Sequence, residues 1–221
     1  MKKAVLATFC VSMLLTGMAS ASPLTDYSAG KVSIDINYSK QGIDFNGYWE
    51  ASFNKKANWD FAGTFGLGNK FALQYAQANT GSNPTSLYDG SYTDSYKLHA
   101  QQFNVLYQLD KNFSLYTGII KVDGTYTYHA SVESAPSNTK NIWQFGVQGH
   151  TKLADKLTGF ASLGIGKDLN TYNIGFGYEF APNLEFNMMY DYKKVKKLAD
   201  DAVPNYDIAV KGLKYGITYK F

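Results

Sequence analysis

The sequence predicts an all-β fold, a ten-stranded antiparallel up-and-down transmembrane β-barrel, with eight strands as the alternative count. Three observations predict it. Apolar and polar residues alternate through successive segments, four short turn sequences join segments in pairs, and the last nine residues alternate without a break up to Phe221. Successive side chains of a strand point to opposite faces, so this alternation indicates strands with one apolar and one polar face. Segments of about ten residues suit a tilted strand that crosses the hydrocarbon layer of a membrane.

The first 21 residues are predicted to be a signal peptide rather than part of the fold. Lys2 and Lys3 precede a nearly continuous apolar run over residues 4–18, and small residues at 19–21 offer a cleavage site after Ala21. The run is shorter than the roughly 20 apolar residues of a membrane-spanning helix. Residues 22–221 are then expected to form one barrel domain.

Ten predicted strands follow one another along the mature chain, each with large apolar residues at every second position. The residues that fill these positions are mostly β-branched or aromatic, the types enriched in strands. The strands are predicted at residues 32–38, 59–67, 71–75, 103–109, 113–119, 143–147, 157–165, 172–180, 184–192 and 213–221. The polar segments between them are interpreted as loops, at residues 41–56, 79–96, 122–140, 166–169 and 193–208.

Four pairs of strands are joined by three turn-type residues between two large apolar residues. These sequences are Leu67-Gly-Asn-Lys-Phe71, Leu109-Asp-Lys-Asn-Phe113, Leu153-Ala-Asp-Lys-Leu157 and Phe180-Ala-Pro-Asn-Leu184. Gly, Asn, Asp and Pro are the residues that tight hairpin turns need, and a three-residue spacer keeps both apolar neighbours on one face. Short turns at one end and longer loops at the other are typical of membrane barrels and not of a water-soluble β-sandwich.

Composition agrees with strands that lie between lipid and water, because the chain has 18 Tyr, 14 Phe and 20 Gly. The only cysteine, Cys10, leaves with the signal peptide, so the mature chain has no disulfide. Loss of Lys2 and Lys3 lowers the formal charge from +3 to +1, which gives no reason to expect nucleic acid as a partner. There is no arginine, which weakens any function that needs bidentate phosphate or carboxylate binding.

The last strand carries a resemblance to a known class of protein. Its apolar residues are Leu213, Tyr215, Ile217, Tyr219 and Phe221, and it is similar to the C-terminal strand of bacterial outer-membrane β-barrel proteins. Over the mature chain the alternation and turns resemble small porin-like and opacity-type barrels. The resemblance implies location in the outer membrane of a Gram-negative-type cell envelope after signal-peptide-directed export. It also implies that Tyr215, Ile217, Tyr219 and Phe221 form the strand that the barrel assembly machinery recognises.

The polar faces of the strands are predicted to point into the lumen, because charge facing lipid costs several kcal/mol. The lumen-facing polar residues are predicted to be Asp35, Asp60, Gln102, Asn104, Gln144, Gln148, Glu179, Glu185, Asp191, Lys214 and Lys220. These side chains fit either of two interiors, a hydrogen-bonded network that fills the barrel or a narrow polar pore. Small inward residues such as Gly118, Gly146, Gly164 and Gly216 leave space that favours the pore.

No recognisable catalytic pattern surrounds His99, His129 or His150, so we expect no enzyme, no cofactor and no metal site. A basic cluster at a loop base, Lys193, Lys194, Lys196 and Lys197, is interpreted as a contact with lipopolysaccharide beside the outer-membrane lipid. The sequence predicts no oligomeric state.

For function, the sequence favours a porin-like narrow channel for passive passage of small solutes. The alternative is a structural or adhesive surface barrel with a plugged lumen, whose extracellular loops bind a partner. Single-channel conductance distinguishes the two.

Overall fold

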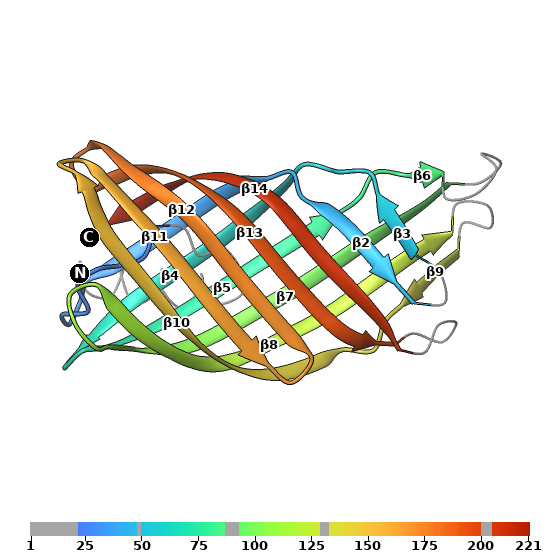
Figure 1. The fold of residues 1–221 in the computed structure, drawn as a ribbon, viewed down its shortest axis with the longest axis horizontal. Coiled ribbons are helices and arrows are strands. Elements are labelled where there is room, and N and C mark those ends of the chain that lie inside the picture. Colours follow the sequence, from blue (N-terminus) through green and yellow to red (C-terminus); the bar gives the residue numbers. More distant parts are fainter. Residues whose placement is uncertain (1–21, 48–49, 87–92, 129–132, 200–204) are drawn as a thin grey trace, which may run out of the picture.

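The computed structural model describes residues 22–47, 50–86, 93–128, 133–199 and 205–221, and it forms one closed β-barrel (Figure 1). Ten antiparallel strands make up the wall, as predicted. In order around the barrel they are β1 (Val32–Ser39), β4 (Asn58–Gly68), β5 (Phe71–Gly81), β7 (Thr93–Gln108), β8 (Phe113–Tyr128), β10 (Lys140–Ala154), β11 (Leu157–Gly166), β12 (Leu169–Ala181), β13 (Leu184–Leu198) and β14 (Tyr206–Lys220). Pairing of β1 with β14, from Ser33 opposite Lys220 to Ser39 opposite Lys214, closes the sheet. None of the described residues belongs to a helix long and apolar enough to cross a membrane.

The four predicted tight turns are confirmed, and they lie at the same end of the barrel as the C-terminus (Figure 1). Asn69 and Lys70 have φ of 52° and 70°, the left-handed values that the central residues of a two-residue hairpin need. Asn183 has φ of 65° in the turn between β12 and β13. Bulges next to three of these turns, at Gly66/Gly68, Lys152/Ala154 and Glu179/Ala181, absorb the odd residue without changing the face of the strand.

At the opposite end the strands run further than the sequence predicted. Residues 41–56, interpreted as a loop, contain β2 (Gly42–Asn46) and β3 (Glu50–Phe53). β2 continues the register of β1 along β14, with Gly42 opposite Lys211. Two further short strands extend the neighbouring hairpins, β6 (Thr85–Ser86) beside β7 and β9 (Glu133–Pro136) beside β8. The predicted loops were too long because short polar-flanked strands give little alternation to detect.

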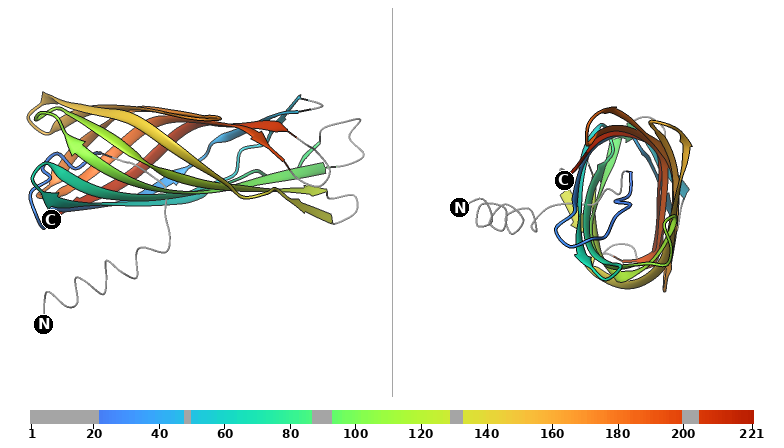
Figure 2. Two further views of the ribbon diagram at one scale, coloured as in Figure 1. Left: turned by 90° about the horizontal axis from the view of Figure 1, so that it is seen from below. Right: turned by 90° about the vertical axis from the view of Figure 1, so that its left-hand side faces the viewer.

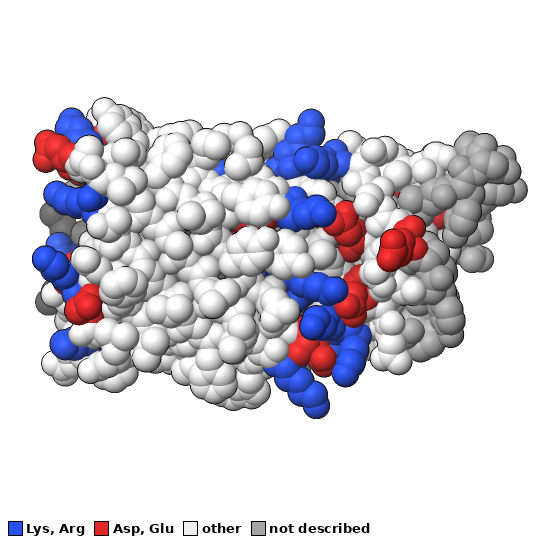
Figure 3. All heavy atoms as spheres, viewed as in Figure 1, with Lys and Arg blue, Asp and Glu red and all other residues white. Residues whose placement is uncertain are grey.

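On the face drawn in Figure 3, an apolar belt covers the wall and a band of charged side chains borders it at each end. Exposed apolar residues on all ten wall strands continue the belt around the barrel. The belt is made of outward-facing Val, Ile, Leu, Phe, Tyr and Trp, such as Trp143 and Phe145, each 63% exposed on the surface of the chain. Such residues fit hydrocarbon rather than water. The tight turns and the C-terminus lie at one border of this belt, and the extended hairpins project beyond the other.

At the second border of the belt, the apolar residues move from the outward-facing positions of the strands to the inward-facing ones. Along β7, Phe103, Val105 and Tyr107 face outward within the belt, whereas beyond it Leu98 and Ala100 are buried inside. The wall is therefore apolar outside and polar inside within the membrane, and the reverse beyond it, where the outer face meets water. Viewed along its axis, the barrel has an oval cross-section, so its two long walls lie close together (Figure 2).

Candidate functional site

The interior of the barrel is the candidate functional site, because it decides between a channel and a closed lumen. Polar side chains fill the half next to the tight turns. Thr218 Oγ1 donates a hydrogen bond of 2.6 Å to Asp35 Oδ1 and accepts one of 3.0 Å from Asn187 Nδ2. Lys220 Nζ donates to Glu185 Oε1 at 2.6 Å and to Ser22 Oγ at 3.3 Å. These partners satisfy some of the polar groups that burial would otherwise make costly, whereas Glu185 Oε2 and Asn187 Oδ1 have no hydrogen-bond partner among the described residues.

A charged layer lies near the middle of the barrel. Lys214 Nζ is 2.8 Å from Asp60 Oδ2 and 3.3 Å from Asp191 Oδ2, and Gln41 Nε2 donates to Asp191 Oδ2 at 3.0 Å. Lys193 borders the same small space, so two lysines balance two aspartates. The space between these side chains is too small to admit water. Buried charges placed in this way are held by each other rather than by solvent.

Amides form a second polar cluster on the other side of the lumen. Asn104 Nδ2 donates to Gln74 Oε1 at 3.0 Å, and Gln144 Nε2 donates to Asn104 Oδ1 at 2.8 Å. These bonds link β5, β7 and β10 along the inner wall. Of the two interiors that the sequence allowed, this part of the lumen therefore matches the hydrogen-bonded network.

The N-terminal segment, residues 22–31, lies inside the mouth next to the tight turns (Figure 2, right). Tyr27 is 1% exposed, and its hydroxyl oxygen accepts a hydrogen bond of 2.8 Å from Gln148 Nε2. Leu24 and Tyr27 pack with Ala72, Leu106 and Tyr116 of the inner wall. The sequence analysis assigned no place in the lumen to this segment, although its two large apolar side chains, Leu24 and Tyr27, were the available signal.

The space left by inward glycines, which favoured a pore, is occupied by neighbouring side chains. The ring of Tyr116 lies over Gly146 and Gly164, and the Asn104 amide lies over Gly118. The Asn37 amide covers Gly216 in the same way. These glycines let larger side chains lie flat on the inner wall, so at these four positions the missing side chain leaves no open space.

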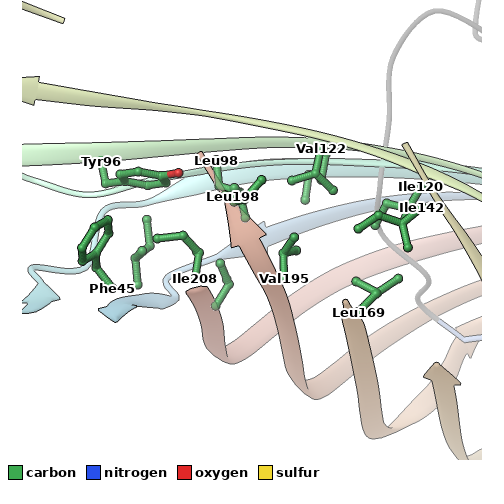
Figure 4. Packing of buried hydrophobic residues seen from close by; sticks show 14 of the residues in the cluster. Phe45, Tyr96, Leu98, Ile120, Val122, Ile142, Leu169, Val195, Leu198 and Ile208 are labelled. Carbon is green, nitrogen blue, oxygen red and sulfur yellow. The ribbon is translucent and has the colours of Figure 1, made fainter. Parts of the chain in front are cut away.

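Beyond the charged layer the interior becomes a hydrophobic core (Figure 4). Leu98, Ile120, Val195 and Ile208 are among its buried residues, and they come from different sides of the barrel. Aromatic contacts cross the lumen. Three of them join Tyr96 of β7 to Tyr206 of β14 with 3.3 Å between hydroxyl oxygens, Phe45 of β2 to Tyr126 of β8 with 6.2 Å between ring centroids, and Phe53 of β3 to Tyr126 with 5.9 Å.

The predicted lumen-facing residues fall into three groups. Those buried inside the barrel are Asp35, Asp60, Asn104, Gln144, Gln148, Glu185 and Lys214. Gln102, Asp191 and Lys220 are partly buried, and Glu179 is exposed at the rim, where β12 approaches its turn. Of the predicted assembly strand, Tyr215, Ile217, Tyr219 and Phe221 all face outward and are exposed.

The basic cluster is split between the two faces of β13. Lys193 faces the interior and is 8% exposed, so it does not fit the predicted lipopolysaccharide contact. The reason is strand alternation, which puts adjacent residues on opposite faces. Lys194 faces outward and lies 3.1 Å from Asp207, and Lys197 lies 3.6 Å from Asp168. Lys196 is partly exposed.

Residues with potential for chemistry are few among the described ranges. His99 Nδ1 lies 3.5 Å from Asp123 Oδ1 on the outer wall, and His150 lies at the opposite end of the barrel. His129 and the predicted signal peptide, residues 1–21, lie outside the described residues. No group of three or more His, Cys, Asp or Glu within the described part of the chain is arranged to hold a metal ion.

Comparisons with known proteins relate the chain by its fold alone. No protein-family model and no curated protein sequence matches it. Among solved structures, the outer-membrane protease OmpT from Escherichia coli is 13% identical, with a TM-score of 0.58, over 94% of this chain and 100% of that one. Neisserial surface protein A is 16% identical with a TM-score of 0.42, over 87% of this chain and 99% of that one. The attachment invasion locus protein Ail of Yersinia pestis is 16% identical with a TM-score of 0.41 over the same shares.

The closed antiparallel barrel and its apolar belt define the class of the chain, and the likeness to OmpT agrees in fold. The chain is an outer-membrane β-barrel protein.

Proposed function

We propose that this barrel is a structural or adhesive surface protein, with a closed lumen and projecting hairpins that bind a partner. The observation that carries the proposal is the contact between Tyr96 and Tyr206, whose hydroxyl oxygens lie 3.3 Å apart across the lumen. The two residues come from β7 and β14, which are separated around the wall by several strands on either side. Their contact spans the interior rather than one pair of neighbours.

Physical chemistry favours closure over the porin-like channel that the sequence suggested. A solute path would have to cross the apolar core around Leu98, Ile120 and Ile208, and narrow apolar constrictions exclude water. It would then have to part the ion pairs of Lys214 with Asp60 and Asp191. The N-terminal segment around Tyr27 occupies the remaining mouth. Three successive layers thus oppose conduction.

The hairpins beyond the belt support the binding part of the proposal. Their core fixes the position of the ends, because Tyr96, Tyr126 and Tyr206 point inward instead of into solvent. Hydroxyl and amide groups face outward there, such as Ser134, which lies 3.3 Å from Thr127. A rigid, hydrogen-bonding rim lowers the ordering cost of binding an extracellular partner.

Conductance in planar lipid bilayers tests the closed lumen. We expect the refolded mature chain to give no discrete openings. A variant that opens all three layers, by deletion of residues 22–29, by Lys214→Ser with Asp60→Ser, and by Leu98→Ala, Ile120→Ala, Ile208→Ala, Tyr96→Ala and Tyr206→Ala, should conduct if the assigned layers are the barrier. Retained heat-modifiable mobility on a gel shows that it is folded. Tyr215→Ala, a change on the lipid face, is the matched control and should stay silent. Discrete openings of the unmodified chain would overturn the proposal in favour of the porin-like channel.

Catalysis has no part in the proposal. The pair of His99 and Asp123 is assigned no reaction, and hydrolysis of a peptide or lipid substrate that is lost in His99→Ala would contradict this.

We also propose that the barrel assembly machinery recognises the terminal strand through its outward aromatic residues. Phe221→Ser should then lower the amount of folded protein in the outer membrane, whereas spontaneous refolding in detergent should be less affected.

A further inference from the structure

A depression of about 340 Å³, bordered mainly by polar and charged residues, lies on the outer wall of the barrel, separate from the lumen. Its floor is the backbone of β5 and β7 near Gly81 and Leu98. The side chains around it come from β5, β7, β8 and the segment before β4, and they include Lys56, Asn79, Lys97, His99, Asp123 and Thr125.

Strand register gives the height of this depression above the belt. On β7, Phe103 is the last outward apolar residue, and His99 and Lys97 face outward four and six residues further along the strand. A strand rises about 3.3 Å per residue and is tilted by roughly 40°, so these residues lie about 10–15 Å beyond the apolar edge. That height corresponds to the sugars of the outer leaflet rather than to its acyl chains.

The side chains of two lysines line the depression. A Cβ added at Gly81 would lie 3.7 Å from Lys56 Cδ and 3.8 Å from Lys97 Cγ, so both stems pass beside Gly81. Among the described residues, neither lysine has a carboxylate within ion-pairing distance. Other lysines at this border do have one, such as Lys211 with Asp44 and Lys194 with Asp207.

The rest of the lining is the pair of His99 and Asp123, 3.5 Å apart, and several uncharged polar groups. Asn58 is already committed to the backbone of Gly81, accepting from its N–H at 3.1 Å. Asn79 and Thr125 make no side-chain hydrogen bond to a described residue. Their amide and hydroxyl groups are therefore available to sugar hydroxyls, since both can donate and accept.

We propose that this depression binds an anionic core sugar, phosphorylated or carboxylated, of the outer-leaflet glycolipid. Lys56 and Lys97 would bind the anionic group as point charges, and Asn79 and Thr125 would hold the neighbouring hydroxyl groups. The site lies on different strands from Lys194, Lys196 and Lys197, and it is independent of whether the lumen conducts.

Titration of two purified glycolipids against the refolded mature chain in detergent micelles tests the site. One is lipid A alone, and the other is a rough-type lipopolysaccharide that carries a phosphorylated inner core. We expect the core-bearing form to bind about tenfold more tightly, the effect of two charge-assisted contacts. Retained heat-modifiable mobility on a gel shows that each variant is folded.

Three variants separate a built site from general surface charge. Lys56→Gln with Lys97→Gln should remove the tenfold preference, and Gly81→Leu should remove it as well by filling the floor while both charges remain. Lys111→Gln with Lys156→Gln, which removes the same charge at the opposite end, should leave the preference unchanged. Equal binding of the two glycolipids by the unmodified chain would overturn the proposal. So would a Gly81→Leu variant that binds normally, or heparin, a free anionic polysaccharide, binding more tightly than the core-bearing lipid.

Discussion

At the scale of single residues, the inward glycines set how closely the walls can pack. Gly118, Gly146, Gly164 and Gly216 are each covered by a neighbour that a Cβ would displace, whereas the outward-facing Gly63 has room for one. A second residue-scale feature is the ionised carboxylate of Asp168 in the turn after β11, which joins separate hairpins beyond the belt.

Gly118→Ala should destabilise the barrel by roughly 1–3 kcal/mol, the cost of overpacking. Its Cβ would clash with the carbonyl oxygen of Phe103 and lie 2.8 Å from Asn104 Cα, so the backbone itself would have to move. Gly63→Ala is the control, because there a Cβ would lie 3.6 Å from the Ser33 carbonyl oxygen. Urea unfolding in detergent micelles measures both. Equal stability of the two variants would mean that the inner wall yields more easily than its packing indicates.

The pKa of the Asp168 carboxyl should lie below its ordinary value of 3.8. The hydrogen bond from Lys140 Nζ, 3.0 Å from Asp168 Oδ2, is the main cause, and the charge of Lys197 adds to it. A lowered pKa means that the ionised form stabilises the fold above pH 3.8, and this contribution is lost as the pH falls through the lowered pKa. NMR titration of the carboxyl carbon measures the pKa. Lys140→Gln should raise it toward the ordinary value, whereas Lys152→Gln, at the far end of β10, should leave it unchanged.

At the scale of elements, the N-terminal segment matters most, because it is part of the interior and not a tether. Gln108 Nε2 donates to the Thr25 carbonyl oxygen at 2.9 Å, and the Gly68 N–H donates to the Tyr27 carbonyl oxygen at 2.8 Å. The segment is thus bound to two of the tight turns and to the inner wall.

Tyr27→Ala should lower the free energy of unfolding by roughly 2–5 kcal/mol, from the cavity it leaves and the unpaired Gln148 amide. Tyr27→Phe should account for only the hydrogen-bond part. Thr25→Ala, whose side chain is exposed, should change stability by less than about 0.5 kcal/mol. The same urea titration measures all three, and a Tyr27→Ala variant as stable as Thr25→Ala would show that the segment is only loosely held.

At the scale of the whole molecule, two environments divide the barrel. Within the belt the lipid faces the apolar side chains. Beyond it, water faces polar side chains, and the apolar ones gather inside, as in a soluble protein.

Phe145→Lys should cost roughly 2–4 kcal/mol in a phospholipid bilayer, because the ammonium group would lie within the belt. Thr151→Lys on the same face of β10, near the tight turn, should cost about 1 kcal/mol or less. Unfolding from lipid vesicles compares them, and equal costs would place the membrane elsewhere on the wall.

The interior shows where prediction from sequence reached its limit. Asp60 and Lys214 were expected in the lumen, but nothing in the sequence paired them, since they lie on β4 and β14 at opposite ends of the chain. Tyr96 and Tyr126 were expected in loops. Beyond the belt the apolar residues switch from the outer to the inner face, and in the sequence this break in the alternation resembles the end of a strand.

The sequence alone determined which face of each membrane strand is apolar, where the tight turns fall and that ten strands close the wall, because these follow from local alternation and turn chemistry. Only the tertiary structure decided what fills the enclosed volume. That depends on the oval cross-section, which brings Tyr96 within reach of Tyr206, and on the place of the N-terminal segment. Contacts across a lumen join residues far apart in the chain, and no local pattern encodes the distance between opposite walls.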